Sequence, residues 1–130
     1  MTLTTIAPHW VAVCTLRQMV PERGVAVLVD RAQVALFRVP SANGEHVHAV
    51  GHQDPFSGAN VMARGIVGSM GNRDTVASPM YKHVFDLATG ECLTDPEVRL
   101  PVHRTLVAGG LVHVSRTPVL AGADLLPVAG

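Results

Sequence analysis

The chain has 130 residues, of which 48% are hydrophobic and 15% are charged, so it can bury one core and is not a disordered chain. Ten basic residues balance ten acidic ones and form no basic patch, which argues against nucleic acid as a partner. The longest apolar runs fall far short of the ~20 residues that a transmembrane helix needs, so we expect no membrane segment.

Short β-type runs separated by turn residues dominate the chain. The expected strands, in order, are residues 10–13, 25–29, 33–38, 46–50, 75–77, 83–86, 104–108 and 111–115. The expected turns are residues 30–31, 40–44, 86–90 and 109–110. Gly109 and Gly110 can both take positive φ, which makes the last turn a good hairpin signal. A short turn of helix is expected around residues 15–19 or 59–62.

These elements predict an all-β fold, a small antiparallel β-sandwich or barrel, because no long stretch has helical periodicity. We expect one domain over residues 10–116, preceded by an N-terminal extension over residues 1–9. Residues 117–130 are rich in Pro, Gly and Ala, which predicts a flexible C-terminal tail that is loosely ordered or held by a partner.

The cysteines and the N-terminus indicate the compartment. Cys14 and Cys92 lie far apart among apolar neighbours and form no Cys-x-x-Cys motif, so neither a zinc ribbon nor a thioredoxin-type site is available. Buried free thiols in a reducing compartment are favoured over a disulfide. The first residues also lack the charged start and apolar run of a signal peptide. We therefore expect a cytoplasmic protein.

Two segments, residues 51–59 and 76–90, have the frame of an iron–sulfur site without its ligands. A Rieske centre is held by two Cys and two His, with both His on one iron. Rieske proteins supply these ligands from two loops, as Cys-Pro-His and Cys-Pro-x-His. Here both prolines remain, but Asp54 and Ser78 stand at the cysteine positions and Phe56 and Tyr81 at the histidine positions. Iron–sulfur clusters need soft thiolates, so these loops are not expected to bind one.

Other sequence motifs accompany the two loops, and their order along the chain is specific. They are Asp-Pro-Phe at 54–56, Arg-Gly-Ile-Val-Gly at 64–68 and Ser-Pro-Met-Tyr-Lys at 78–82, together with the segments 10–14, 33–38 and 85–93. With these motifs, residues 10–115 resemble the small subunit of NAD(P)H-dependent assimilatory nitrite reductase, a Rieske-like domain that lacks the cluster.

The resemblance implies a Rieske-like all-β fold with two inserted loops and no cofactor of its own. The large subunit of such enzymes carries FAD, an iron–sulfur cluster and siroheme, takes electrons from NAD(P)H and reduces nitrite to ammonia. The present chain would then be a non-redox accessory subunit that is not catalytic on its own and that docks to and supports the large subunit. This expectation includes no nucleic acid and no membrane partner.

The four replaced positions allow two compatible interpretations. In the first, the rings of Phe56 and Tyr81 fill the space of the cluster while Asp54 and Ser78 accept hydrogen bonds from loop backbone N–H groups. In the second, the loop tips form a docking surface, as the corresponding tip does in Rieske proteins. The partner-binding candidates are Phe56, Arg64, Tyr81 and Lys82. For the two cations, solvated surface charge is the simpler explanation.

The histidines support a different hypothesis, a stand-alone interaction or metal-binding module. His46 and His48 lie two residues apart, so on a strand they share one face, and His103 or His113 could supply a third ligand. Exposed strand histidines are the simpler account, and no metal site is predicted. A Rieske-type ferredoxin would need the four missing ligands. No Gly-x-Ser-x-Gly or G-x-G-x-x-G motif indicates a catalytic residue or a dinucleotide site.

Overall fold

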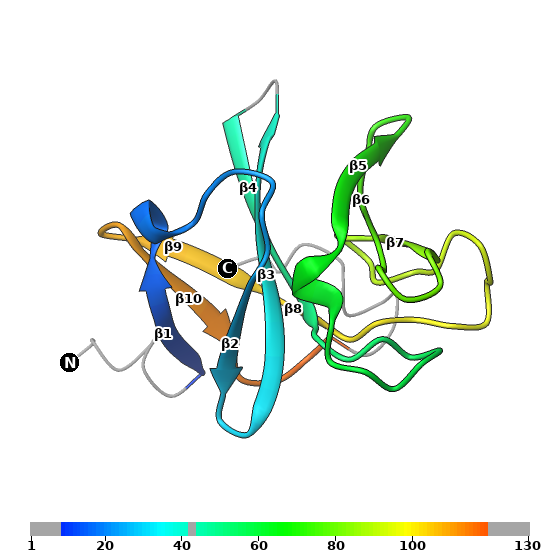
Figure 1. Ribbon diagram of the computed structural model, residues 1–130. Helices are drawn as coiled ribbons and strands as arrows, with labels where there is room; N and C mark the ends of the chain where they lie inside the picture. Colours follow the sequence, from blue (N-terminus) through cyan, green and yellow to red (C-terminus); the bar gives the residue numbers. More distant parts are fainter. Residues whose placement is uncertain (1–8, 42–43, 120–130) are drawn as a thin grey trace.

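The computed structural model describes residues 9–41 and 44–119 and is built from strands and two single turns of 3-10 helix (Figure 1). The elements are β1 (Trp10–Thr15), η2 (Leu16–Gln18), β2 (Val25–Val29), β3 (Ala32–Ser41), β4 (Gly44–Gly51), η3 (Met62–Arg64), β5 (Ile66–Met70), β6 (Arg73–Ala77), β7 (Val84–Asp86), β8 (Val102–His103), β9 (Thr105–Ala108) and β10 (Leu111–Ser115). The predicted all-β class is therefore confirmed. Among the described residues, no helix has the length and apolar character to cross a membrane.

The strands form three antiparallel sheets, with the orders β1-β10-β9, β2-β3-β4-β8 and β5-β6-β7. Figure 1 shows the second sheet in the middle, with the β1-β10-β9 sheet on one side and the β5-β6-β7 sheet on the other. The two candidate loops follow β4 and β6, so one loop extends from the central sheet and the other from the third sheet.

Strand β3 is buried on both faces and joins two hydrophobic clusters. Successive side chains of a strand point to opposite faces, so Ala35 and Phe37 enter one cluster while Val34 and Leu36 enter the other. The first cluster packs the central sheet against the third sheet, with buried members Ala35, Phe37, Val39, Val50, Met62, Val76, Phe85, Leu87, Cys92, Leu100 and Val102. The second packs it against the first sheet, with buried members Met19, Val29, Val34, Leu36, Ala49, Val112 and Val114.

The predicted hairpin turns agree with the structure, with one exception. Gly109 and Gly110 join β9 and β10 with φ of 61° and 77°, as predicted from the Gly-Gly pair. The turn expected over residues 40–44 is shorter than predicted. Pro40 still pairs with Glu45, and the β3–β4 ladder continues to Ser41 and Gly44, because proline can occupy a strand position where its missing N–H is not needed.

Two strands were not expected, β5 and β8. Strand β8 also holds the described part of the expected tail, since Val119 pairs with Val102 and donates its N–H to the Val102 carbonyl oxygen at 2.6 Å. The remainder of the expected tail and the expected N-terminal extension up to residue 8 lie outside the described residues.

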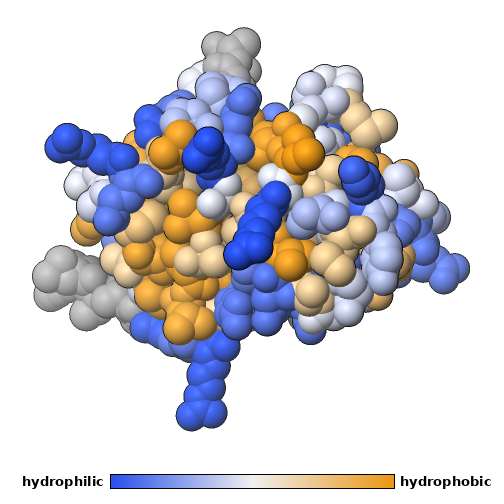
Figure 2. Space-filling model, viewed as in Figure 1, coloured by the Kyte–Doolittle hydropathy of each residue, from blue (hydrophilic) through white to orange (hydrophobic). Residues whose placement is uncertain are grey.

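The edge strands β1 and β2 lie side by side without pairing, and hydrophobic residues gather on the surface over them (Figure 2). Leu28 on β2 is 62% exposed. The first and second sheets therefore remain open at this edge and form a sandwich rather than a closed barrel.

Candidate functional site

Two short loops form the candidate site. Loop 1 (residues 53–60) follows β4, and loop 2 (residues 78–83) follows β6. In loop 1, Asp54 accepts a backbone hydrogen bond from Gly58 and donates one to Ala59, both at 2.8 Å. In loop 2, Ser78 accepts one from Lys82 at 3.0 Å and donates one to His83 at 2.9 Å. The residue at each former cysteine position therefore closes its own loop.

Asp54 and Ser78 also join the two loops to each other. Both side chains are buried, and the Ser78 hydroxyl donates a hydrogen bond of 2.5 Å to Asp54 Oδ2. Asp54 Oδ1 accepts from the Phe56 N–H at 2.8 Å, and Ser78 Oγ accepts from the Met80 N–H at 3.2 Å. The predicted capping of loop N–H groups is confirmed, and a hydrogen bond between loops takes the place of a metal bridge.

The Asp54 carboxylate stays ionised at neutral pH despite its burial. Burial raises its pKa, but hydrogen bonds from the Ser78 hydroxyl and from the backbone N–H groups of Phe56 and Ser57 lower it, and the net pKa is below the usual value. The bond to Ser78 is thus charge-assisted, which accounts for its shortness and makes it stronger than a neutral one.

The aromatic contact between the loops differs from the expected one. The Phe56 ring stacks on the ring of His83, with centroids 3.7 Å apart and planes at 14°, and packs against the first hydrophobic cluster. Tyr81 is 60% exposed, so the expectation that its ring fills this space is wrong. Lys82 has φ of +62°, and this left-handed turn separates the outward Tyr81 from the inward His83.

His83 is a site residue that sequence reasoning missed. Besides the stack, its Nδ1 lies 2.8 Å from Thr94 Oγ1, which anchors loop 2 to the segment after β7. The motif spacing pointed to Tyr81, and only the turn at Lys82 places the residue two positions later against Phe56.

The donor groups present do not fit a Rieske cluster. Asp54 and Ser78 offer oxygen atoms that are already bonded to each other, and Phe56 and Tyr81 offer no imidazole. The thiols lie elsewhere and are free: Cys92 is buried in the first hydrophobic cluster, and Cys14 is partly buried on β1.

The remaining partner-binding candidates lie on the surface around the loops. Tyr81 and Lys82 are exposed at the tip of loop 2, next to Met80, which is 46% exposed. Arg64 is exposed at the end of η3, just after loop 1. It lies near buried His52, whose pKa is lowered by burial and, to a smaller extent, by the Arg64 charge. Phe56 is only partly accessible because of its stack.

The histidines of the alternative hypothesis converge only in part. His46 and His48 lie together on β4, with ring centroids 5.9 Å apart. His103 is instead directed to the Ser115 carbonyl oxygen at 2.8 Å, and His113 to the Leu106 carbonyl oxygen at 3.2 Å. Neither of these two histidines therefore joins the His46–His48 pair, because each ring is engaged by a backbone carbonyl oxygen, of β10 and β9 respectively.

Comparisons with known proteins agree with this geometry. A family model described as "Rieske-like [2Fe-2S] domain" matches residues 9–115. The NADH nitrite reductase small subunit of Escherichia coli K12 is 31% identical over 106 residues, 82% of this chain and 96% of that protein. The NAD(P)H nitrite reductase large subunit of Klebsiella oxytoca is 32% identical over 115 residues, 88% of this chain but 12% of that protein.

A solved structure supports the same assignment. The crystal structure assigned to an NADH-dependent nitrite reductase small subunit of Mycobacterium tuberculosis has a TM-score of 0.77 and 49% identity, and the match covers 83% of this chain and 95% of that one. The predicted Rieske-like fold and the predicted resemblance are both confirmed. The chain therefore belongs to the Rieske-like [2Fe-2S] domain family, among the small subunits of nitrite reductase.

Proposed function

We propose that this chain is a non-redox accessory subunit of a cytoplasmic NAD(P)H-dependent nitrite reductase. It docks to the large catalytic subunit and supports the reduction of nitrite to ammonia. The observation that carries the proposal is near full-length similarity to a small subunit, together with a match inside a large subunit, where domain and catalytic chain share one polypeptide. A domain that is covalently linked to the catalytic polypeptide is held close to it.

The chain itself contributes no cofactor in this proposal. The buried Asp54–Ser78 hydrogen bond and the Phe56–His83 stack, which occupy the space between the two loops, support this part of the proposal. Electrons would pass from NAD(P)H to nitrite through FAD, an iron–sulfur cluster and siroheme of the large subunit. The free thiols suit a reducing cytoplasm.

The tip of loop 2 is the favoured docking surface. Met80 and Tyr81 present exposed apolar area beside the Lys82 charge, a combination that suits the centre and rim of a protein interface. The loop base is fixed by buried hydrogen bonds, so the tip is held ready for binding at little entropic cost.

The test is nitrite-dependent NAD(P)H oxidation by the large subunit, purified with and without this chain at matched siroheme content. We expect a clear loss of activity without the chain and co-elution of the two on a sizing column. The Tyr81→Ala/Lys82→Gln double variant should lose both co-elution and support of activity while it unfolds like the wild type.

The matched control is Arg17→Gln/Val107→Ala, which removes a cation and an exposed apolar group from η2 and β9. It should behave like the wild type in both assays. Full activity of the large subunit alone, with no co-elution, contradicts the proposed function, whereas equal behaviour of the two double variants contradicts only the choice of docking surface.

A further inference from the structure

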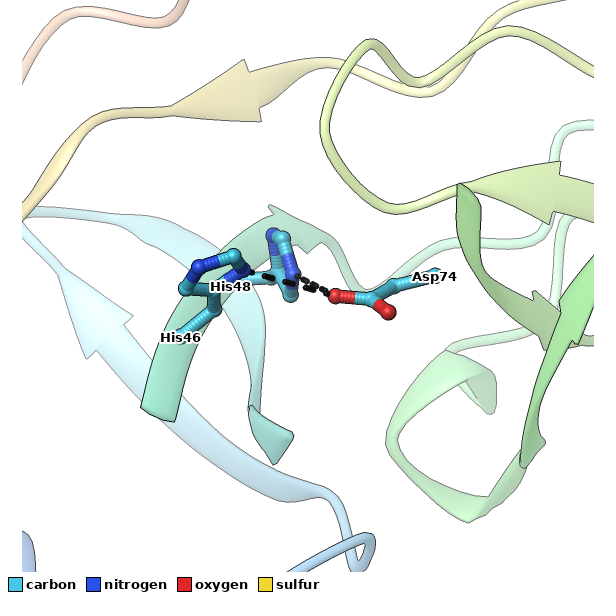
Figure 3. Close-up of side chains that lie close together, drawn as sticks. All are labelled: His46, His48 and Asp74. Atoms are coloured by element: carbon cyan, nitrogen blue, oxygen red, sulfur yellow. Dashed lines mark hydrogen bonds and ion pairs between the residues drawn. The ribbon is translucent and has the colours of Figure 1, made fainter. Parts of the chain in front are cut away.

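Two histidines and one aspartate converge between the central and third sheets (Figure 3). His46 and His48 lie two residues apart on β4, so both point to the face of the central sheet that packs on the third sheet. Asp74 of β6 faces them across that contact. One ligand atom from each residue, an imidazole nitrogen or a carboxylate oxygen, lies within 4.8 Å of the other two.

The distances approach those of a metal coordination shell. His48 Nε2 lies 2.9 Å and His46 Nδ1 lies 3.7 Å from the same oxygen, Asp74 Oδ2. Tetrahedral Zn²⁺, with bonds of about 2.0–2.1 Å, holds its ligand atoms roughly 3.3 Å apart. The two observed values lie on either side of this distance, and the two imidazole nitrogens lie within 4.8 Å of each other, so rotation of the His46 and His48 side chains toward Asp74 would complete the shell.

A simple ion pair explains only part of this arrangement. His48 alone satisfies Asp74 Oδ2 with a hydrogen bond, whereas the 3.7 Å from His46 Nδ1 is too long for one. His46 is half exposed and could turn toward water, yet its ring stands edge-on to the His48 ring with a nitrogen toward the carboxylate. A metal ion bound by both histidines and Asp74 would explain why both imidazole rings turn a nitrogen toward the carboxylate.

The surrounding charges and backbone also suit a cation. The cluster opens onto a surface pocket of about 590 Å³, which gives an ion access and leaves room for a water ligand. Arg73, the cation that precedes Asp74 in the sequence, is engaged by Asp86 at 3.3 Å and Glu91 at 3.2 Å. The ligands stand on paired strands, and the Asp74 carbonyl oxygen accepts the Leu87 N–H at 2.9 Å, so the backbone under the site is fixed.

We infer that His46, His48 and Asp74 form a binding site for a divalent transition metal, with Zn²⁺ as the favoured ion and water as the fourth ligand. Two imidazoles and one carboxylate are the ligand types that zinc accepts, and imidazole does not favour Mg²⁺ or Ca²⁺. The ion would tie β4 to β6, which leads directly into loop 2, and so would stabilise the base of the loop. Metal binding at this site does not require that the chain docks to a large subunit.

The test uses the full-length, tag-free chain after treatment with a chelator. Equilibrium dialysis should show about one zinc ion bound per chain, and zinc should raise the Tm, since a metal that binds only the folded state stabilises it. Cobalt(II) in place of zinc should give visible absorption of a four- or five-coordinate ion.

Three variants separate this site from general surface binding. His46→Ala removes a half-exposed ligand with little risk to folding, and Asp74→Asn keeps the shape of the third ligand. Each should weaken zinc binding by about tenfold or more and abolish the cobalt spectrum. The control is His113→Ala, a histidine on β10 outside the cluster, which should bind like the wild type. Equal zinc binding by all four proteins, or none by the wild type at micromolar zinc, would overturn the inference.

Discussion

The hydrogen bond between Asp54 and Ser78 replaces a metal bridge with an ionised, fully buried carboxylate. Asp54→Asn keeps the shape of the side chain but presents N–H hydrogens toward either Ser78 or Phe56, so one donor loses its acceptor. We expect this change to lower the free energy of unfolding at pH 7 by about 2 kcal/mol, measured by urea titration. Asp95→Asn, which alters a carboxylate that caps Glu97 in an exposed loop, should cost clearly less.

The same pair makes a pH-dependent contribution whose sign follows from the lowered pKa of Asp54. The folded-state pKa lies below the ordinary value of 3.8, so the carboxylate stabilises the fold fully above that value. The contribution disappears as the pH falls through the lower folded-state pKa. The difference in unfolding free energy between wild type and Asp54→Asn should therefore shrink in acid. A difference that grows below pH 3.8 would contradict the assignment of an ionised, hydrogen-bonded Asp54.

The aromatic residues of the two loops should respond differently to truncation. Phe56→Ala removes the ring that stacks on His83 and packs on the first hydrophobic cluster, and we expect a loss of about 2–3 kcal/mol in unfolding free energy. Tyr81→Ala should change it by less than about 0.5 kcal/mol, since the side chain is exposed. Equal losses in the two variants would mean that Tyr81 contacts the core in solution.

For single residues, the sequence predicted local hydrogen-bonding roles better than it predicted where the ring of each aromatic residue lies. The Asp-Pro-Phe and Ser-Pro-x-Tyr motifs were enough to identify Asp54 and Ser78 as capping residues, because short polar side chains next to turns act locally. His83, rather than Tyr81, stacks on Phe56 because Lys82 has a positive φ. A lysine in the sequence does not indicate that conformation.

Among the connecting elements, the turn after β7 depends most strictly on a glycine. Gly90 has φ of +79°, and a Cβ there would lie 2.1 Å from the Leu100 carbonyl oxygen. Gly58 in loop 1 has nearly the same φ, +78°, but open space around it. Gly58→Ala should therefore cost only the left-handed strain of about 1–2 kcal/mol, while Gly90→Ala should cost that strain plus the displacement of β-structure around Leu100. Urea titrations that ranked the two variants equally would show that this turn can shift at no cost.

Strands were predictable from the sequence where burial imposed a pattern. The continuous apolar run of β3 reflects burial on both faces, and the Gly-Gly pair after β9 signals its own turn. Strand β5 escaped prediction because four of its five residues are exposed and Gly68 interrupts it. Strand β8 is only two residues long, too short for any periodicity.

At the scale of the whole molecule, contacts between sheets could not be derived from the sequence. His48 and Asp74 are 26 residues apart and belong to different sheets, so no spacing rule links them. The pairing of two histidines on one strand was predictable from the two-residue period, but the third ligand was sought among histidines rather than among carboxylates. Packing of the third sheet on the central one decides which residue completes such a cluster.

Because β3 contributes to both hydrophobic clusters, we expect the domain to unfold as one cooperative unit. The chain offers a reporter in each half: Trp10, its one tryptophan, lies on β1, and Phe85, a fully buried ring, lies on β7 in the first hydrophobic cluster. Urea transitions followed by Trp10 fluorescence and by the NMR signals of Phe85 should coincide. Val114→Ala, in the second cluster on the Trp10 side, should destabilise by about 2 kcal/mol and move both transitions equally. If only the Trp10 transition moved, the two clusters would be independent, and β3 would have to remain folded in the third-sheet half after losing its partner on the other face.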